Sequence, residues 1–150
     1  MTEMVRSVYQ RLNHADTARP VEFRLGSLPP ARGDRGLFEQ VWMNLLSNAV
    51  KFSGKTDRPV IEVGGLSEER EQVYYVRDNG AGFDPRYRSK MFGVFQRLHR
   101  DEEFPGTGVG LALVHRIVTR HGGRIWADGK PGQGATFHFS VPKEPDDGRV

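Results

Sequence analysis

The stretch LFEQVWMNLLSNAVKF, residues 37–52, decides the fold more than any other part of the sequence. Apolar residues recur along it at helical spacing, which predicts a long helix that is buried around most of its circumference. At about 100° per residue, the polar residues of this helix fall within a single sector of roughly 100°. They are Gln40, Asn44, Ser47, Asn48 and Lys51. The helix therefore combines an apolar surface for a core with one narrow polar stripe.

The composition of this polar stripe favours a bound ligand. A solvated helix face is normally built from Lys, Glu and Arg, which are good helix formers, whereas Asn is a poor one. Here Asn44 and Asn48 lie one turn apart. Amide oxygens can ligate Mg²⁺, which prefers oxygen, and the nearby Lys51 can neutralise a phosphate. We interpret the stripe as a binding site, with an ordinary solvated face as the alternative.

Two glycine-containing segments predict further ligand contacts, although neither is specific by itself. DNGAG, residues 78–82, directly follows an expected strand. There the Asp78 carboxylate can accept a hydrogen bond from an exocyclic amine, while the glycines let a flat ring approach. GTGVG, residues 106–110, opens an expected helix, whose free N–H groups favour an anion. The first segment is also a common turn. The second also suits a hinge, and it matches neither the P-loop nor the dinucleotide-binding fingerprint.

Helices and strands are both expected, and they are mixed along the chain. A helical pattern covers residues 3–14 and 109–121, and the second of these ends at Gly122 and Gly123. Asp34 is expected to cap the helix of residues 37–52. Alternating apolar residues predict strands at 21–25, 60–66, 72–77, 124–127 and 135–141. This mixture predicts an α/β two-layer sandwich, in which a mixed, mostly antiparallel sheet of about five strands packs on about three helices.

The length of 150 residues suits one domain. Residues 84–108 are polar, charged and aromatic without clear periodicity, and irregular segments of that length are often functional lids. We expect the domain to span residues 1–142 and residues 143–150 to form a flexible tail.

The composition argues against several classes of protein. There is no cysteine, so disulfides, thiolate metal sites and cysteine nucleophiles are excluded. The absence of cysteine also fits a reducing setting, and we expect the cytoplasm or the cytoplasmic side of a larger sensor. No apolar run is long enough to cross a bilayer, and we expect no direct membrane contact. The formal net charge is +3, and basic and acidic residues are interspersed. Because there is no dense basic stripe with interleaved aromatic residues, we do not expect nucleic-acid binding.

Together, in this order and at these intervals, the motifs resemble those of the catalytic, ATP-binding domain of bacterial sensor histidine kinases, within the superfamily that includes gyrase, Hsp90 and MutL ATPases. The segments that carry the resemblance are NLLSNAVKF at 44–52 (N box), DNGAGF at 78–83 (G1 box), FGVF at 92–95 (F box), GTGVGL at 106–111 (G2 box) and GQGATF at 132–137 (closing strand motif).

The resemblance spans the chain from the first helix to about Val141 and implies the Bergerat-type ATP-binding fold. Residues 92–98 are most similar to those of phytochrome-type kinases. At the adenine end of the nucleotide, the resemblance implies that Asp78 binds the exocyclic amine. The residues expected beside it are Gly80, Gly82 and Phe83, with Thr136 acting directly or through water.

At the phosphate end, the resemblance implies that Asn48 is a ligand of Mg²⁺. Asn44 and Lys51 are expected to contact the phosphates and to carry the catalytic step, since phosphoryl transfer depends mainly on positioning and charge stabilisation. Phe92 and Phe95 are expected to anchor the lid. The lid residues expected to hold the phosphates are Arg97, Gly106, Thr107, Gly108, Val109, Gly110 and Leu111. ATP and Mg²⁺ are therefore the expected cofactors.

One part of a complete histidine kinase is missing from the sequence. Such a kinase needs an acceptor histidine followed by an acidic residue in a characteristic context. None of the five histidines has that context, and we interpret them as structural or surface residues: His14, His99, His115, His121 and His138. The expected partners are therefore a dimerisation domain that carries the acceptor histidine, and a response regulator downstream.

The identity of residue 44 separates two kinds of chemistry. In the hydrolysing members of the superfamily, a Glu lies four residues before the metal-binding Asn and acts as a general base. This sequence has Asn44 there, and an amide cannot take up a proton. Transfer to histidine is therefore favoured over hydrolysis. The alternatives are a hydrolytic ATPase of the same superfamily and a non-catalytic nucleotide-binding or interaction module.

Overall fold

The computed structural model describes residues 1–12, 21–53, 56–80, 107–129 and 133–143. Within these ranges the chain forms three helices and five strands. In chain order they are α1 (Thr2–Arg11), β1 (Glu22–Leu25), α2 (Arg35–Ser53), β2 (Val60–Ser67), β3 (Glu71–Asp78), α3 (Thr107–Arg120), β4 (Ile125–Gly129) and β5 (Ala135–Pro142).

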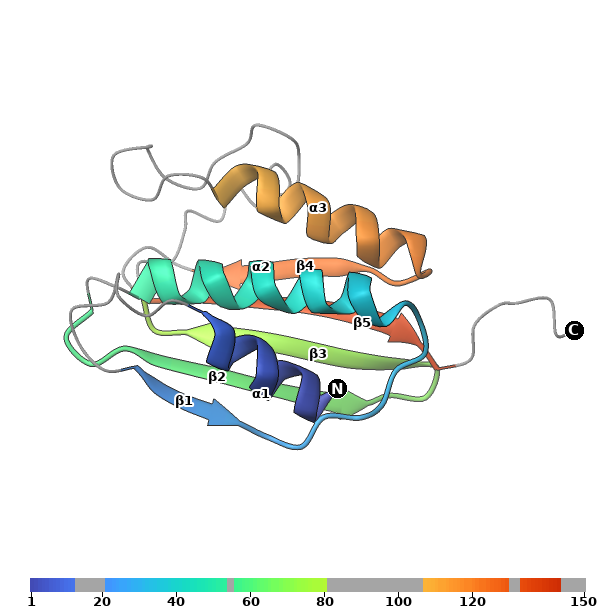
Figure 1. Ribbon diagram of the computed structural model, residues 1–150, viewed down its shortest axis with the longest axis horizontal. Helices are drawn as coiled ribbons and strands as arrows, with labels where there is room; N and C mark the ends of the chain where they lie inside the picture. Colours follow the sequence, from blue (N-terminus) through green and yellow to red (C-terminus); the bar gives the residue numbers. More distant parts are fainter. Residues whose placement is uncertain (13–20, 54–55, 81–106, 130–132, 144–150) are drawn as a thin grey trace, which may run out of the picture.

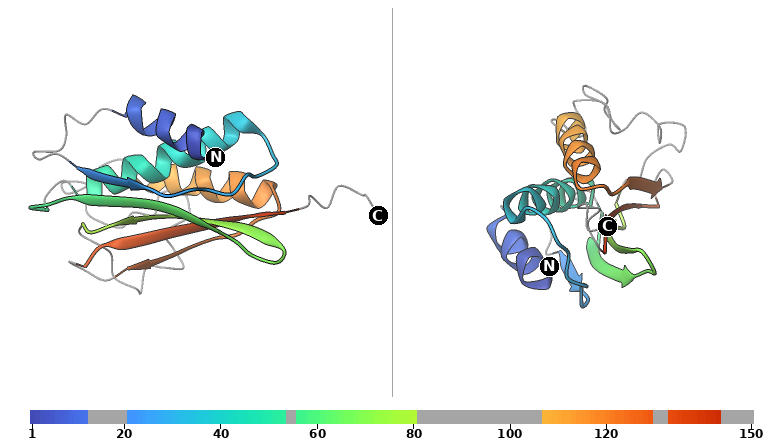
Figure 2. Two further views of the ribbon diagram at one scale, coloured as in Figure 1. Left: turned by 90° about the horizontal axis from the view of Figure 1, so that it is seen from below. Right: turned by 90° about the vertical axis from the view of Figure 1, so that its right-hand side faces the viewer.

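The five strands form one sheet in the order β1-β2-β3-β5-β4. β1 runs parallel to β2, and the other neighbouring strands are antiparallel. All three helices cover one face of this sheet, and no described helix covers the other face (Figures 1 and 2). The expected two-layer α/β sandwich with a mixed, mostly antiparallel sheet is therefore confirmed.

Several element boundaries differ from those expected. α1 ends at Arg11 because Leu12 has extended dihedral angles. α3 begins at Thr107, two residues earlier than expected, so Gly108 belongs to the helix. β4 covers Ile125–Gly129 rather than residues 124–127, because its pairing with β5 continues as far as Gly129 opposite Ala135. Of the expected lid, residues 84–106 lie outside the described ranges, as do residues 144–150 of the expected tail.

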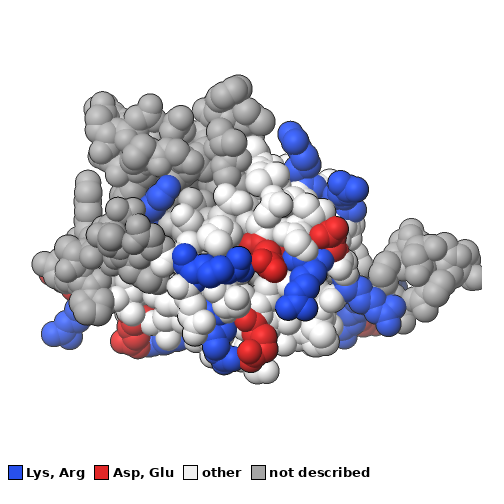
Figure 3. Space-filling model, viewed as in Figure 1, with Lys and Arg blue, Asp and Glu red and all other residues white. Residues whose placement is uncertain are grey.

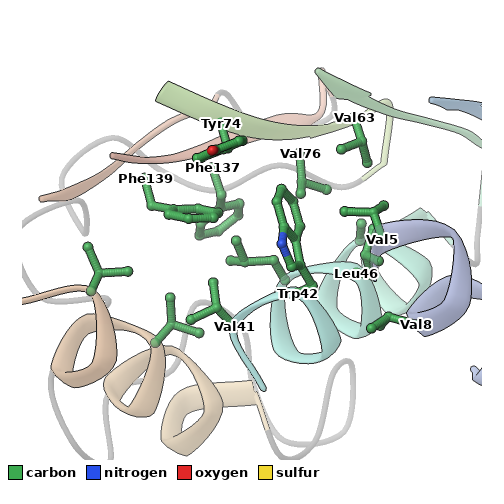
Figure 4. Packing of buried hydrophobic residues seen from close by; sticks show 14 of the residues in the cluster. Val5, Val8, Val41, Trp42, Leu46, Val63, Tyr74, Val76, Phe137 and Phe139 are labelled. Carbon is green, nitrogen blue, oxygen red and sulfur yellow. The ribbon is translucent and has the colours of Figure 1, made fainter. Parts of the chain in front are cut away.

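The core lies between the sheet and α2, and Trp42 fills its centre (Figure 4). The indole is fully buried and meets the ring of Tyr74 edge-on, with centroids 5.8 Å apart. It meets Phe139 of β5 in the same way at 5.1 Å. Such aromatic pairs add about 0.5–1.5 kcal/mol beyond their buried area. Because Trp42 fixes the rotation of α2 against the sheet, it also fixes the direction in which the polar stripe points.

At one end of the α2–α3 pair, hydrogen bonds satisfy backbone groups at the start of α2 and after the end of α3. Asp34 caps α2, since its Oδ1 accepts from the Leu37 N–H at 2.9 Å. Gly122, two residues beyond the end of α3, has φ of 81°, and the Gly123 N–H donates to the Val118 carbonyl at 3.0 Å, as in a Schellman motif. We call this end, residues 33–38 with residues 117–123, the capped end.

His121 joins the two helices at the capped end. Its Nε2 accepts a hydrogen bond from the Asp34 N–H at 3.1 Å, and its Nδ1 lies 2.9 Å from the Ile117 carbonyl oxygen. The ring also packs on Phe38, with centroids 4.6 Å apart. Because Nε2 accepts from the Asp34 N–H, Nδ1 is the ring nitrogen that can donate to the Ile117 carbonyl. His121 is thus a structural residue, as expected.

None of the helices in the described ranges is long and apolar enough to span a membrane.

Candidate functional site

The candidate site lies at the opposite end of the α2–α3 pair. Figure 1 shows that α2 ends and α3 begins at the same end of the sandwich, where β3 also ends. The second half of the polar stripe, Asp78 and the first turn of α3 therefore meet there. We call this end, residues 44–53, 78–80 and 107–111, the open end.

Asp78 is a buried carboxylate at the last position of β3. It is 4% exposed, and its Oδ1 accepts a hydrogen bond from the Gly80 N–H at 2.8 Å. Burial raises the pKa of Asp78 to about 7, although the backbone N–H groups of Gly80 and Ala135 oppose this rise by donating hydrogen bonds to the carboxylate. A carboxylate with so little solvation gains more from a new hydrogen-bond donor than an exposed one does.

Asn48 is the most deeply buried residue of the stripe, with 5% of its surface exposed. Its Nδ2 is buried and has no hydrogen-bond partner in the described part of the chain. A buried polar group without a partner costs about 1–3 kcal/mol, so natural cores seldom retain one without a role. A buried amide and a buried carboxylate thus face the same end of the fold, and the two polar groups together suit a polar ligand.

The rest of the stripe is only partly solvated. Asn44, Ser47 and Lys51 are half-buried, while Gln40, farthest from the site, is exposed. The Asn44 Nδ2 donates to the Gln40 carbonyl one turn earlier, at 2.8 Å. This bond uses the donor side of the Asn44 amide.

Two glycines near Asp78 are required by backbone packing. A Cβ on Gly80 would lie 2.2 Å from the Phe52 carbonyl oxygen, so Gly80 lets the end of β3 pack against the last turn of α2. Gly134 has φ of +89°, and a Cβ there would lie 2.2 Å from the Asp78 carbonyl oxygen. These glycines hold Asp78 against its neighbours, a role separate from shaping a pocket for a flat ring.

Thr136 and Asp78 both line one hollow, but their side chains lie on opposite faces of the sheet. Side chains alternate along a strand, and the register places Thr136 opposite Arg77, on the sheet face away from the helices. There Arg77 Nε donates to the Thr136 Oγ1 at 3.4 Å. Ala135, opposite Asp78, lies on the helix side instead. The signal was present in the sequence, since the alternation of the core residues Phe137 and Phe139 places Ala135 on their face.

The remaining expected site residues fall into three groups, which lie in the core, in the first turn of α3 and outside the described ranges. Leu111 is fully buried in the hydrophobic core. Residues 107–110 form the first turn of α3, of which the structure describes the backbone. The expected site residues outside the described ranges are Gly82, Phe83, Arg97 and Gly106, together with the lid anchors Phe92 and Phe95.

Sequence reasoning overlooked one residue of the G1 segment. The Asn79 side chain accepts a hydrogen bond from the Val60 N–H at 2.9 Å and donates one to the Arg58 carbonyl at 2.8 Å. It therefore ties the end of β3 to the start of β2. Asparagine is common in turns, so the pattern alone gave no sign of this long-range contact.

A hollow of about 650 Å³ adjoins the site without containing the stripe. Asp78 contributes to its wall, but no residue of the polar stripe does. Five of its twelve lining residues form a row of paired positions that crosses the uncovered sheet face: Arg24, Glu62, Arg77, Thr136 and Asp128. This hollow therefore extends over the uncovered sheet face from the end of β3, away from the residues of the stripe.

Residues 33–145 match the model of a protein family described as histidine kinase-, DNA gyrase B- and HSP90-like ATPases. The chain is 39% identical over 140 residues to the phytochrome-like protein Cph1 of Synechocystis, covering 93% of this chain and 19% of that protein. It is 45% identical over 114 residues to the methanogenesis regulatory histidine kinase FilI of Methanothrix harundinacea, covering 76% and 13%. The chain thus spans less than a fifth of these relatives.

Solved structures give the same picture. A mycobacterial sensor histidine kinase, MprB, superposes with a TM-score of 0.81 at 27% identity, covering 97% of both chains. Full-length ShkA, solved in complex with AMPPNP, gives a TM-score of 0.77 at 27% identity, covering 96% of this chain and 30% of that one.

Proposed function

The chain belongs to the family of histidine kinase-, DNA gyrase B- and HSP90-like ATPases, and from this membership we propose that it is the catalytic domain of a two-component sensor histidine kinase. It would bind ATP with Mg²⁺ and donate the γ-phosphoryl group to a histidine of a dimerisation domain outside these 150 residues, with a response regulator as the next acceptor. The observation that carries the proposal is the pairing of a buried carboxylate, Asp78, with the buried, unpartnered amide of Asn48 at one end of the fold.

Asp78 would recognise adenine. Its ionised carboxylate is an acceptor, and the exocyclic amine of adenine is a donor. Guanine presents a carbonyl oxygen at the corresponding position, which would face the carboxylate unfavourably. Because a site built to accept a hydrogen bond rejects a ligand that lacks the donor, Asp78 favours ATP over GTP.

Asn48 would hold Mg²⁺ through its side-chain oxygen, with the half-buried Asn44 and Lys51 toward the phosphates. An amide oxygen suits this cation, which usually keeps several waters and binds few protein groups. When bound, the cation neutralises charge on the phosphate oxygens. Lys51 adds positive charge at the last turn of the same helix.

In the transfer step, an imidazole nitrogen of the acceptor histidine attacks the γ-phosphorus, and the bond to the oxygen that bridges the β- and γ-phosphates breaks. ADP leaves with the electron pair of that bond. Asn44 offers no base to activate water, which supports transfer over hydrolysis. The role of this chain is then to hold the nucleotide in a site that has no general base at residue 44 to activate water.

The test has two stages. Isothermal titration with ATP, with and without Mg²⁺, is expected to show Mg²⁺-dependent binding that weakens by about 10- to 100-fold in Asp78→Asn, because a charge-assisted hydrogen bond is worth about 1.5–3 kcal/mol. Thr136→Val is the matched control, since this side chain lies on the other face of the sheet. Equal affinity in wild type and Asp78→Asn would refute the adenine assignment.

The second stage measures transfer of labelled phosphate to a separately supplied acceptor domain. Asn48→Ala is expected to abolish transfer. Rapid release of inorganic phosphate without an acceptor would instead identify a hydrolytic ATPase. Nucleotide binding without transfer to any cognate acceptor would identify a non-catalytic binding module.

A further inference from the structure

Two hollows adjoin each other at the capped end, and both are lined by basic side chains. One has a volume of about 660 Å³ and the other about 520 Å³, and Arg32 contributes to both walls. The cations of the two walls are Arg32, Arg70, Arg120 and Lys143. Among the described residues that line them, Glu69 is the one carboxylate. Figure 3 shows several Lys and Arg side chains over this end, where α2 begins and α3 ends. We call the four cations Arg32, Arg70, Arg120 and Lys143 the basic cluster.

Part of the basic charge on the described surface is matched by carboxylates of the same chain. Five arginines have a carboxylate partner, in the pairs Arg6–Glu3, Arg11–Glu39, Arg24–Glu22, Arg77–Glu62 and Arg124–Glu71. No cation of the basic cluster forms an ion pair with a carboxylate of the described ranges. Four cations without a carboxylate partner thus lie around two adjoining hollows, and their charge is available to a partner.

The backbone that carries the basic cluster is held firmly. A Cβ on Gly33 would lie 2.5 Å from the His121 ring and 2.6 Å from Phe38, so the chain beside Arg32 is packed directly against the end of α3. Arg120 precedes His121, which is bonded to the Asp34 N–H. On the other side, the Lys143 N–H donates to the Arg70 carbonyl at 3.0 Å. Fixed backbones reduce the entropy that is lost on binding.

We propose that the basic cluster is a docking surface for an acidic peptide segment of a partner protein, in which carboxylates meet Arg32, Arg70, Arg120 and Lys143. This surface is distinct from the proposed nucleotide site. The 19 residues of α2 separate the two by about 28 Å at 1.5 Å per residue. Nucleotide and partner can therefore bind at the same time.

The chemistry of the walls favours a peptide over a nucleic acid or a lipid surface. Gln72 lines the larger hollow, and its buried Oε1 has no hydrogen-bond partner in the described part of the chain. A peptide backbone supplies N–H donors for such an oxygen, whereas phosphate groups supply acceptors only. Among the described residues, no Phe, Tyr or Trp lines either hollow, so nucleic-acid bases find no aromatic ring there on which to stack.

The probe is a dye-labelled peptide of eight glutamates, titrated into the 150-residue chain at low salt and followed by fluorescence anisotropy. We expect saturable binding that weakens at least about tenfold in the double variant Arg32→Glu/Lys143→Glu, because two attractive contacts become repulsive. Amide chemical shifts should change around residues 32–33, 70–72, 120–122 and 143, and should not change around Asp78.

The matched control is Arg6→Glu, which reverses an exposed arginine on α1 outside both hollows. It should leave peptide affinity within about twofold of wild type. Unchanged thermal unfolding of the double variant establishes that it is folded. The proposal fails if the peptide does not bind, or if Arg6→Glu weakens binding as much as the double variant. It also fails if an oligonucleotide or vesicles containing phosphatidylserine bind more tightly than the peptide and lose affinity in the same variant.

Discussion

At the capped end of the α2–α3 pair, the polar groups of Asp34, His121 and Gly123 are bonded within the protein. At the open end of the same two helices, Asn48 retains a buried donor without a partner in the described ranges, and Asp78 carries a carboxylate whose pKa is raised by burial. The two ends therefore contribute differently to the free energy of folding. The capped end contributes stability, while the open end gives up stability to keep polar groups available for a ligand.

The sharpest test of this contrast is Gly123→Ala at the capped end. A Cβ there would lie 1.8 Å from the Ser140 carbonyl oxygen, so the backbone of β5 or the α3–β4 connection must move. We expect the free energy of unfolding, measured by urea denaturation, to fall by about 3 kcal/mol. Gly36→Ala is the control, since its Cβ meets nothing closer than 3.4 Å. It should be neutral or stabilising by about 0.5–1 kcal/mol. Equal effects of the two changes would contradict the close packing described for Gly123.

Asn48→Leu should have the opposite effect on stability at the open end. The substitution replaces the unpartnered amide by an apolar group of similar volume, and we expect the free energy of unfolding to rise by about 1–3 kcal/mol. Nucleotide binding, measured by titration with Mg²⁺–ATP, should be lost in the same variant. A large loss of stability would show that the Asn48 amide supports the fold.

The pH dependence of stability tests Asp78. Burial raises its pKa from 3.8 to about 7, so between these values the folded protein holds a proton that the unfolded chain has released. Stability must therefore fall as pH rises from about 4 to about 7, by at most about 1.4 kcal/mol per pH unit from this group. Urea denaturation across this range should show the slope, and Asp78→Asn should remove it. An identical slope in both proteins would assign it to other groups.

The smallest expected effect is that of Asp34→Ala. Loss of the side-chain cap should lower the free energy of unfolding by about 1 kcal/mol and leave nucleotide affinity unchanged, because the cap lies at the capped end. Thermal denaturation and ATP titration measure the two quantities. Asp34→Asn, which keeps a capping oxygen, should restore most of the stability. A fall in ATP affinity in Asp34→Ala would show that the two ends of the helix pair are coupled.

The parts of the fold that depend on local patterns could be predicted from the sequence. The helical spacing around Trp42, the Asp34 cap and the glycines after α3 each act within a few residues, and the structure confirms all three. The sheet face to which Thr136 points also follows from the local alternation with Phe137 and Phe139, whereas its position opposite Arg77 depends on pairing with a distant strand. The tie from Asn79 to β2 was missed for the same reason. The nucleotide roles of Asn44, Lys51 and the lid glycines stay predictions.

The parallel pairing of β1 with β2 has a consequence for the order in which the chain folds. Glu22 pairs with Val60, so β1 cannot join the sheet until all of α2 and the start of β2 have been synthesised. Trp42 likewise cannot form its ring contacts until Tyr74 and, near the end of the chain, Phe139 have been synthesised. Contacts between such distant residues close slowly. On the ribosome, the apolar surface of α2 therefore emerges well before the strands that cover it, and it is the segment most in need of protection by a chaperone during synthesis.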